Sequence, residues 1–290
     1  MENAKIVSFT KRAIVLMIAI LMLIQPLALV TAYASPAPTK YFDDAYYDYA
    51  GDNGEVSVDD SYDVYYDELV DTSIALANVP SMKNLLSLPN ACAAVTGFSV
   101  VTFYDRYYPE LIPDYEPGIL ASNGIYVYYP DRNLAATSAV FSSLHTLMGS
   151  SDGTTSAEFR NGLDDYAESV GRNATYQSMY STSRTVNLTT LASAVDQNKV
   201  GVIMCSAYNF VSSIIPVTEE NKVAIAKNNS TVGHMMMVYG YRVLEYYADG
   251  ALFRTDTFLY VTSSYSSGIK GYILLNDDLD IDEAYVVTIA

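Results

Sequence analysis

Two cysteines and two histidines limit the nucleophilic and acid–base chemistry that this 290-residue sequence can carry out. Cys92 stands at the predicted start of a helix, directly after Pro89 and Asn90-Ala91, and proline and asparagine favour a turn or cap there. Unpaired backbone N–H groups and the positive end of the helix dipole stabilise a thiolate at such a position, and they can also hold a developing oxyanion. The alternative interpretation is a buried structural cysteine on an Ala-rich helix.

His234 follows Val232-Gly233 and opens an apolar run that predicts a strand. A histidine at the head of a strand is well placed to reach a cleft, where it can act as the base that activates a thiol. The alternative is a core histidine that fills the end of the strand.

The second cysteine, Cys205, and the second histidine, His145, are not expected to take part in catalysis. Cys205 lies in the middle of a predicted strand, which favours a buried hydrophobic residue over a redox centre. A disulfide between Cys92 and Cys205 is a further alternative, and it would abolish the thiol chemistry. His145 lies on a predicted helix and is expected to be structural or exposed.

Composition excludes several other functions. The chain has 16 Lys and Arg against 33 Asp and Glu, and a net charge of −17 repels nucleic acids and anionic lipids. Four cysteines and histidines in all are too few for a disulfide scaffold or a zinc cluster. The acidic cluster over residues 277–283 lacks the glycine of a calcium loop and reads as a solvated turn. No phosphate loop or dinucleotide motif occurs, so we predict no metal and no cofactor.

The elements that must position Cys92 and His234 are helices in the first half and strands in the second. Helices are predicted over residues 91–107, 134–148, 155–170 and 189–198, and the third begins with a capping-box pattern, Thr155 and Glu158. The first should bury one face, formed by Val95, Phe98, Val101 and Tyr104 or Asp105. Strands are predicted over residues 200–206, 234–243, 252–262 and 271–275, with a hairpin turn at residues 249–250. This order predicts an α+β fold.

The amino terminus is typical of a secretory signal peptide over residues 1–34. A positive region precedes an apolar run over residues 13–24, and Ala32-Tyr33-Ala34 offers a cleavage site before Ser35. The alternative is an uncleaved anchor, but a run of about 12 residues is shorter than the roughly 20 that a membrane span needs. We therefore predict a secreted or extracytoplasmic protein without stable membrane insertion after cleavage.

The next segment, residues 35–72, is an acidic, tyrosine-rich linker or propeptide. Residues 41–72 contain eleven acidic residues, seven tyrosines and no lysine or arginine. Uncompensated carboxylates are costly to bury, so we expect this stretch to be disordered or loosely docked. One functional domain should then span residues 73–290.

Several motifs resemble the papain-like cysteine peptidases, and in particular the bacterial secreted branch related to the double-glycine leader peptidases of bacteriocin export. They are Val79-Pro80, Asn90-Ala91-Cys92 at a helix start, the segment over residues 153–166, and Gly233-His234-x-Met-x-Val-x-Gly-Tyr on a strand. The resemblance covers about residues 78–290. It implies a helical half that bears the cysteine helix, followed by an antiparallel β half.

The resemblance also implies site residues. Cys92 would be the nucleophile, and His234 would be the general base and then the general acid. The family orients its histidine with an Asn or Asp, and Ser263 occupies that position here, with Tyr265 in place of a tryptophan.

Other positions implied by the resemblance are open. The family's oxyanion glutamine is missing between Ser35 and Cys92, and Asn84 or Asn90 could supply an amide in its place. Asn276 or Asp256 could orient His234 if the loops bring them near.

The first hypothesis is therefore a secreted cysteine peptidase that acts on peptides or proteins through an acyl-enzyme. The second is a binding or surface protein on the same fold with impaired catalysis, which is favoured by the serine at position 263, the missing glutamine, and Ala93-Ala94 in place of the usual Gly-Pro. A structural surface protein of another fold is a third class. The sequence predicts neither the substrate nor the oligomeric state.

Overall fold

The computed structural model describes residues 58–59, 62–115, 118–120, 126–128, 133–180, 185–264, 269–276 and 279–290. All of these residues belong to a unit that spans Pro36–Ala290. The predicted signal peptide, its cleavage site and residues 35–57 of the acidic segment lie outside the described ranges. Tyr265, Asp277 and Asp278 also lie outside them.

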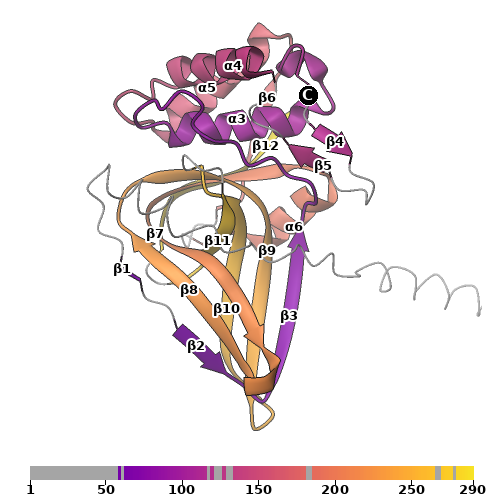
Figure 1. Cartoon of the computed structure of the whole chain (residues 1–290), viewed down its shortest axis with the longest axis vertical. Coiled ribbons are helices and arrows are strands. Elements are labelled where there is room, and N and C mark those ends of the chain that lie inside the picture. The colour runs from indigo at the N-terminus through magenta and orange to yellow at the C-terminus, as the bar shows by residue number, and fades with distance from the viewer. Residues whose placement is uncertain are drawn as a thin grey trace, which may run out of the picture. The chain divides into compact units, whose positions relative to one another are not determined.

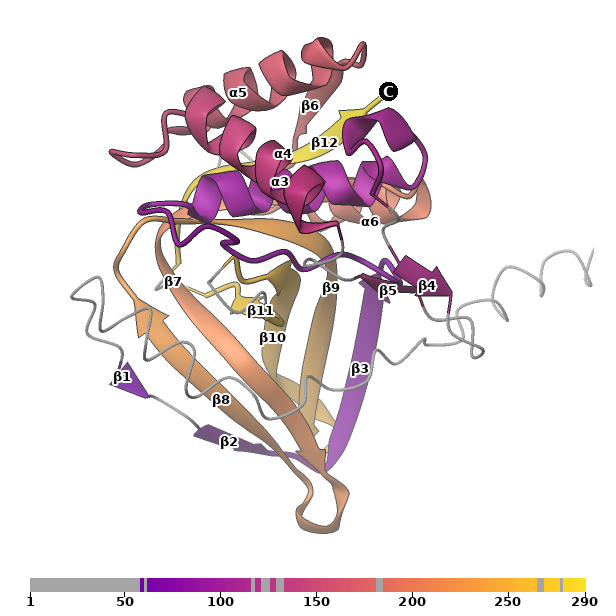
Figure 2. The ribbon, with the colours of Figure 1, turned by 45° about the horizontal axis from the view of Figure 1, so that its top comes forward.

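Four α-helices occur in the described residues, and each lies where the sequence predicts a helix. They are α3 Cys92–Asp105, α4 Leu134–Leu147, α5 Ser156–Ser169 and α6 Leu188–Asp196. Short 3-10 turns form at Pro109–Leu111 and Thr218–Glu220. Figures 1 and 2 show α3, α4 and α5 stacked together at one end of the long strands. None of the helices in the described ranges combines the length and the apolarity that a membrane span requires.

Helix α3 is buried on all sides. The residues of the predicted apolar face are buried, and so is every other residue of the helix after Cys92. The reason is that α3 lies between other elements: it contacts α4 and α5 as well as strands β9 (His234–Ala248) and β12 (Asp280–Ile289). A helix in such a position is apolar all round rather than along one stripe.

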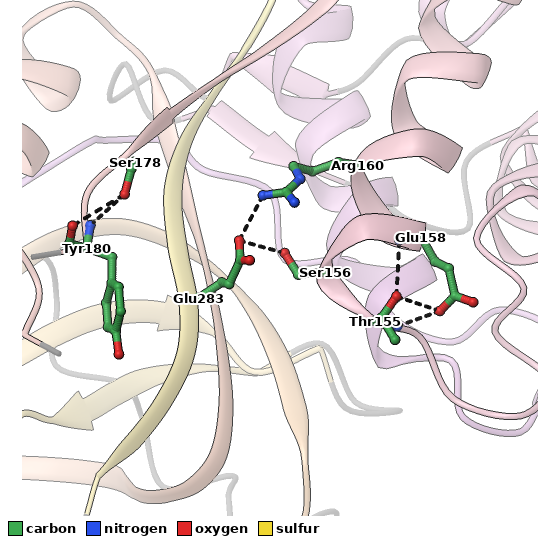
Figure 3. A network of polar contacts seen from close by, with 7 residues as sticks. All are labelled: Thr155, Ser156, Glu158, Arg160, Ser178, Tyr180 and Glu283. Carbon is green, nitrogen blue, oxygen red and sulfur yellow. Dashed lines mark hydrogen bonds and ion pairs between the residues drawn. The ribbon is translucent and has the colours of Figure 1, made fainter. Parts of the chain in front are cut away.

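The start of α5 is held by polar contacts that Figure 3 shows from close by. The hydroxyl of Thr155 accepts a hydrogen bond from the Glu158 N–H, and the Glu158 carboxylate accepts one from the Thr155 N–H at 2.7 Å, which confirms the predicted capping box. Glu283 of β12 accepts hydrogen bonds from Ser156 Oγ at 2.9 Å and from Arg160 Nη1 at 2.8 Å. From Asp280 onwards the acidic cluster forms strand β12, so the predicted turn is wrong there, although Asp280 and Asp282 are exposed to solvent as predicted. Glu283 of the same cluster pairs with Arg160 of α5.

Ten strands of the described chain form one antiparallel sheet. Its main order is β1-β8-β7-β11-β10-β9-β3; β2 pairs with β8, β6 with β12, β12 with β7, and β7 also with β9. The strands not yet bounded are β1 Val58–Asp59, β2 Tyr62–Tyr65, β3 Glu68–Ala75, β6 Ala174–Ser178, β7 Val200–Val217, β8 Lys222–Ser230, β10 Ala251–Thr262 and β11 Lys270–Leu274. A separate pair consists of β4 Gly118–Leu120 and β5 Tyr126–Tyr128.

The second half follows the predicted strand pattern, but it contains longer and additional strands. Strand β7 continues eleven residues beyond the predicted end at residue 206, through a bulge between Val211 and Ser213, because β8 and β11 pair with this added part. Strand β8 was not predicted, although its buried residues alternate with less buried ones. The hairpin turn is confirmed, since Asp249 and Gly250 have φ values of 51° and 74°. The described residues thus form an α+β unit.

The predicted linker ends earlier than residue 72. Strands β2 and β3 place residues 62–65 and 68–75 in the main sheet, paired with β8 and β9. Asp71 accepts hydrogen bonds from Arg242 Nε at 3.0 Å and Nη2 at 2.7 Å, and Asp63 lies 3.0 Å from Lys222 Nζ. The expectation of disorder was wrong for these residues. Their carboxylates are neutralised by cations that lie far away in the sequence but close by in the fold.

Candidate active site

Cys92 is the first residue of α3, as the sequence predicts. The preceding residue, Ala91, is the N-cap and provides no side-chain hydrogen bond to the first turn. Cys92 is half-buried, and its thiol is not part of a disulfide. The N–H groups of this turn have no capping side chain and lie at the positive end of the helix, where they favour negative charge.

The loop before Cys92 is held by side chains on both sides. His145 of α4 lies with Nε2 3.1 Å from the Pro89 carbonyl, and Asn90 donates its amide N–H to the Ser151 carbonyl at 2.9 Å. Asn84 donates to the Leu88 carbonyl at 2.7 Å and accepts from the Leu88 N–H at 3.0 Å. These contacts give His145 the structural role expected for it, and they engage the amides of both asparagines in holding the loop.

His234 opens β9 and is almost fully enclosed, with 2% of its surface exposed. Its Nε2 lies 2.5 Å from the backbone carbonyl oxygen of Ser263. Tyr208 of β7 stacks on the ring with centroids 5.7 Å apart and planes at 24°. A carbonyl oxygen can only accept, so Nε2 carries the proton and the lone pair of the neutral ring lies on Nδ1.

Burial controls the charge of this histidine. Desolvation lowers the pKa of His234 to about 4, and the Ser263 carbonyl opposes that shift only in part because it stabilises the N–H of the protonated ring. The imidazole is therefore neutral at pH 7.

Ser263 lies beside His234, and its backbone carbonyl rather than its side chain contacts the ring. It follows directly after the end of β10 and is fully buried. Its N–H donates to the Ile269 carbonyl at 2.7 Å, which fixes the backbone on the other side of the residue. The contact that was expected from a side chain thus comes from a main-chain oxygen.

Two hydroxyls join the start of α3 to this region. Thr96 donates from Oγ1 to the Met235 carbonyl at 2.9 Å, and the same atom lies 2.7 Å from Ser264 Oγ. Thr96 stands one helical turn after Cys92 and on the same side of α3, while Met235 and Ser264 are chain neighbours of His234 and Ser263. The three segments that carry the predicted site residues therefore meet in one place.

Sequence reasoning missed Thr96, Ser264 and Tyr208. A threonine inside a helix and a tyrosine inside a strand carry no signal of such a role. The left-handed backbone of Ser264, with φ 55°, is equally invisible in the sequence.

The two other candidates for orienting His234 have other partners. Asp256 accepts a hydrogen bond from Arg254 Nε at 2.9 Å and stands seven residues before Ser263, which corresponds to roughly 23 Å along an extended strand. Asn276 accepts a hydrogen bond from Asn209 Nδ2 at 3.1 Å.

Cys205 is buried in β7, as predicted, directly opposite His234 in the β7–β9 pairing. Burial raises the pKa of its thiol far above the ordinary range, which makes the thiolate inaccessible at neutral pH. Neither cysteine forms a disulfide, so the alternative of a Cys92–Cys205 bond does not apply.

The described part of the chain contains no group of three or more His, Cys, Asp or Glu side chains arranged to hold a metal ion. The chain matches no family model and no curated protein sequence.

Proposed function

We propose that this protein is a secreted, papain-like thiol hydrolase that cleaves peptide or amide bonds, with Cys92 as the nucleophile and His234 as the base. The observation that carries the proposal is the 2.5 Å contact between His234 Nε2 and the Ser263 carbonyl, beside the start of α3. It supports the proposal because it fixes the tautomer whose Nδ1 lone pair can accept a thiol proton.

In the proposed reaction, Nδ1 of His234 takes the proton of Cys92 as the sulfur attacks the substrate carbonyl carbon. The carbonyl electron pair moves onto oxygen, and backbone N–H groups at the start of α3 stabilise that oxyanion. The C–N bond then breaks, His234 gives its proton to the leaving amine, and a thioester remains on Cys92. A water molecule that loses its proton to Nδ1 hydrolyses the thioester and restores the thiol.

The low basicity of His234 shapes this mechanism. Because the ring is neutral at pH 7, a resting ion pair between thiolate and imidazolium is not expected. The proton instead moves from sulfur to nitrogen during the attack. A base with a pKa of about 4 provides less assistance than one with a pKa near the working pH.

The second candidate function is a papain-like binding or surface protein with impaired catalysis. The 2% exposure and the low pKa of His234 favour it, since both limit proton transfer to a bound substrate. The partners would again be peptides or proteins, which the second candidate would bind without cleaving.

The test is labelling with a thiol-directed electrophilic peptide, followed by mapping of the modified residue. The hydrolase predicts modification at Cys92 in the wild-type protein, loss of labelling in Cys92→Ala, and retention in Cys205→Ala. If the folded wild-type protein stays unlabelled by a panel of such peptides, the binding protein is the better account. N-terminal sequencing of exported protein tests the proposed location, and a chain that still begins at Met1 would contradict cleavage before Ser35.

A further inference from the structure

We propose that Thr96 and Ser264 are positioning residues that hold the Ser263 carbonyl against His234 and tie both to the helix that begins with Cys92. The proposal rests on the proposed function for its catalytic meaning. The structure itself shows a chain of hydrogen bonds, which we call the relay. It links the Met235 carbonyl to Thr96 and Thr96 to Ser264, whose backbone is joined to the Ser263 carbonyl.

The direction of each hydrogen bond in this relay follows from the number of protons. Thr96 has one hydroxyl proton, and it donates that proton to the Met235 carbonyl at 2.9 Å. In the 2.7 Å contact with Ser264, Thr96 must therefore accept and Ser264 must donate. Both side chains are buried, so water does not compete for these bonds.

The Ser264 contact controls where the Ser263 carbonyl points. That carbonyl belongs to the peptide plane shared by Ser263 and Ser264, so the φ angle of Ser264 sets the plane relative to the Ser264 side chain. Ser264 has φ 55°, a left-handed conformation that non-glycine residues seldom adopt. A buried hydrogen bond from its hydroxyl compensates for the unfavourable backbone geometry.

The peptide plane on the other side of Ser263, which it shares with Thr262, is fixed as well. The Ser263 N–H donates to the Ile269 carbonyl at 2.7 Å, and the Ser263 carbonyl meets His234 Nε2 at 2.5 Å. Removing the Thr96–Ser264 contact removes the side-chain hydrogen bond that supports the left-handed φ of Ser264, and this φ sets the direction of the Ser263 carbonyl. We therefore expect the ring of His234 to lose its fixed tautomer.

The experiment compares Thr96→Val, Thr96→Ser and Ser264→Gly with a matched control, Thr102→Val. Thr102 is a buried threonine on the same helix whose hydroxyl has no hydrogen-bond partner among the described residues. Ser264→Gly removes the hydroxyl but accepts a left-handed backbone, so it carries the test if Thr96→Val fails to fold. The readouts are the ¹⁵N chemical shifts of the His234 ring, which distinguish its tautomers, and the rate of Cys92 labelling.

We expect the wild-type protein, Thr96→Ser and Thr102→Val to show the Nε2–H tautomer of His234 and labelling rates within about threefold of one another. Thr96→Val and Ser264→Gly should show mixed tautomers and label at least about tenfold more slowly, which corresponds to the loss of one oriented hydrogen bond at the base. Folded Thr96→Val and Ser264→Gly proteins with the wild-type tautomer would overturn the proposal. If the wild-type protein is never labelled but these two variants still shift the tautomer, the positioning role stands and the hydrolase fails.

Discussion

The carbonyl oxygen of Ser263 lies 2.5 Å from Nε2 of His234, so a main-chain atom orients the ring. A backbone acceptor is present whatever residue occupies the position. Its direction depends on the conformation of the neighbouring residues rather than on the identity of residue 263. Substitutions of Ser263 should therefore act through packing.

We predict that Ser263→Ala keeps the labelling rate of Cys92 within about threefold of wild type, because the carbonyl remains in place. Loss of a buried hydroxyl should cost about 0.5–1.5 kcal/mol of unfolding free energy. Ser263→Asn should instead destabilise the protein by about 1–3 kcal/mol, since the site is fully buried and a larger side chain overpacks it. Urea unfolding and labelling kinetics measure both effects. A tenfold loss of labelling in a stable Ser263→Ala protein would show that the side chain matters.

The buried His234 should make the protein less stable as the pH falls. The unfolded ring takes up a proton below its ordinary pKa of 6.5, whereas burial lowers the pKa of the folded ring to about 4. Between these values the unfolded state binds more protons, so this group should reduce the unfolding free energy by up to about 1.4 kcal/mol per pH unit. His234→Gln should lack this slope between pH 6.5 and 4 in urea-unfolding series. An unchanged slope in the variant would contradict the burial of a neutral ring.

Asp105 at the end of α3 should have the opposite effect. Burial raises the pKa of its carboxyl from 3.8 to about 7, against a hydrogen bond from the Ile112 N–H at 2.8 Å and with a small contribution from Glu110. The folded state therefore binds more protons between these values, and stability is lost as the pH rises from about 4 to about 7. Asp105→Asn keeps an acceptor for Ile112 and should gain stability relative to wild type between pH 5 and pH 8. Parallel curves for the two proteins would exclude a protonated Asp105.

Strand β3 should depend on its ion pair with β9. Arg242 is largely covered, and Asp71 binds it through two hydrogen bonds, so Asp71→Ala leaves a half-buried cation and should cost about 1–3 kcal/mol of unfolding free energy. The matched control is Asp63→Ala, because Lys222 keeps its second carboxylate partner, Glu220, at 2.8 Å. That variant should lose less than about 1 kcal/mol, because Lys222 stays paired with Glu220 and no cation is left without a carboxylate. Equal losses in the two variants would contradict a specific role for the Asp71–Arg242 pair.

Local patterns in the sequence were sufficient to predict the four helices. They also predicted that Cys92 begins a helix and that His234 begins a strand. The Thr155–Glu158 capping box and the hairpin turn at Asp249-Gly250 depend on residues a few positions apart, and both are confirmed. The α+β order follows from the same short-range signals.

Ion pairs between residues far apart in the sequence could not be predicted from these local patterns. Asp71 looked unsuited to a packed strand because its partner, Arg242, lies 171 residues away. Glu283 lies in β12 and binds Arg160, at a separation of 123 residues. The orienting atom of His234 is a backbone oxygen, and main-chain atoms are common to every residue type, so no motif can identify it.

The pH dependence of labelling provides the last prediction. Because His234 is neutral above a pKa of about 4, the wild-type rate should change little from about pH 6 to 8 and fall as the ring is protonated near pH 4. His234→Gln has no internal base, so its rate should increase steadily with pH, as that of an unassisted thiol does. Cys205→Ala is the control and should follow the wild-type curve, since the Cys205 thiol is buried. A wild-type rate that increases tenfold per pH unit across this range, in parallel with His234→Gln, would mean that His234 takes no proton from Cys92. The second candidate function, a binding protein with impaired catalysis, would then be the better account.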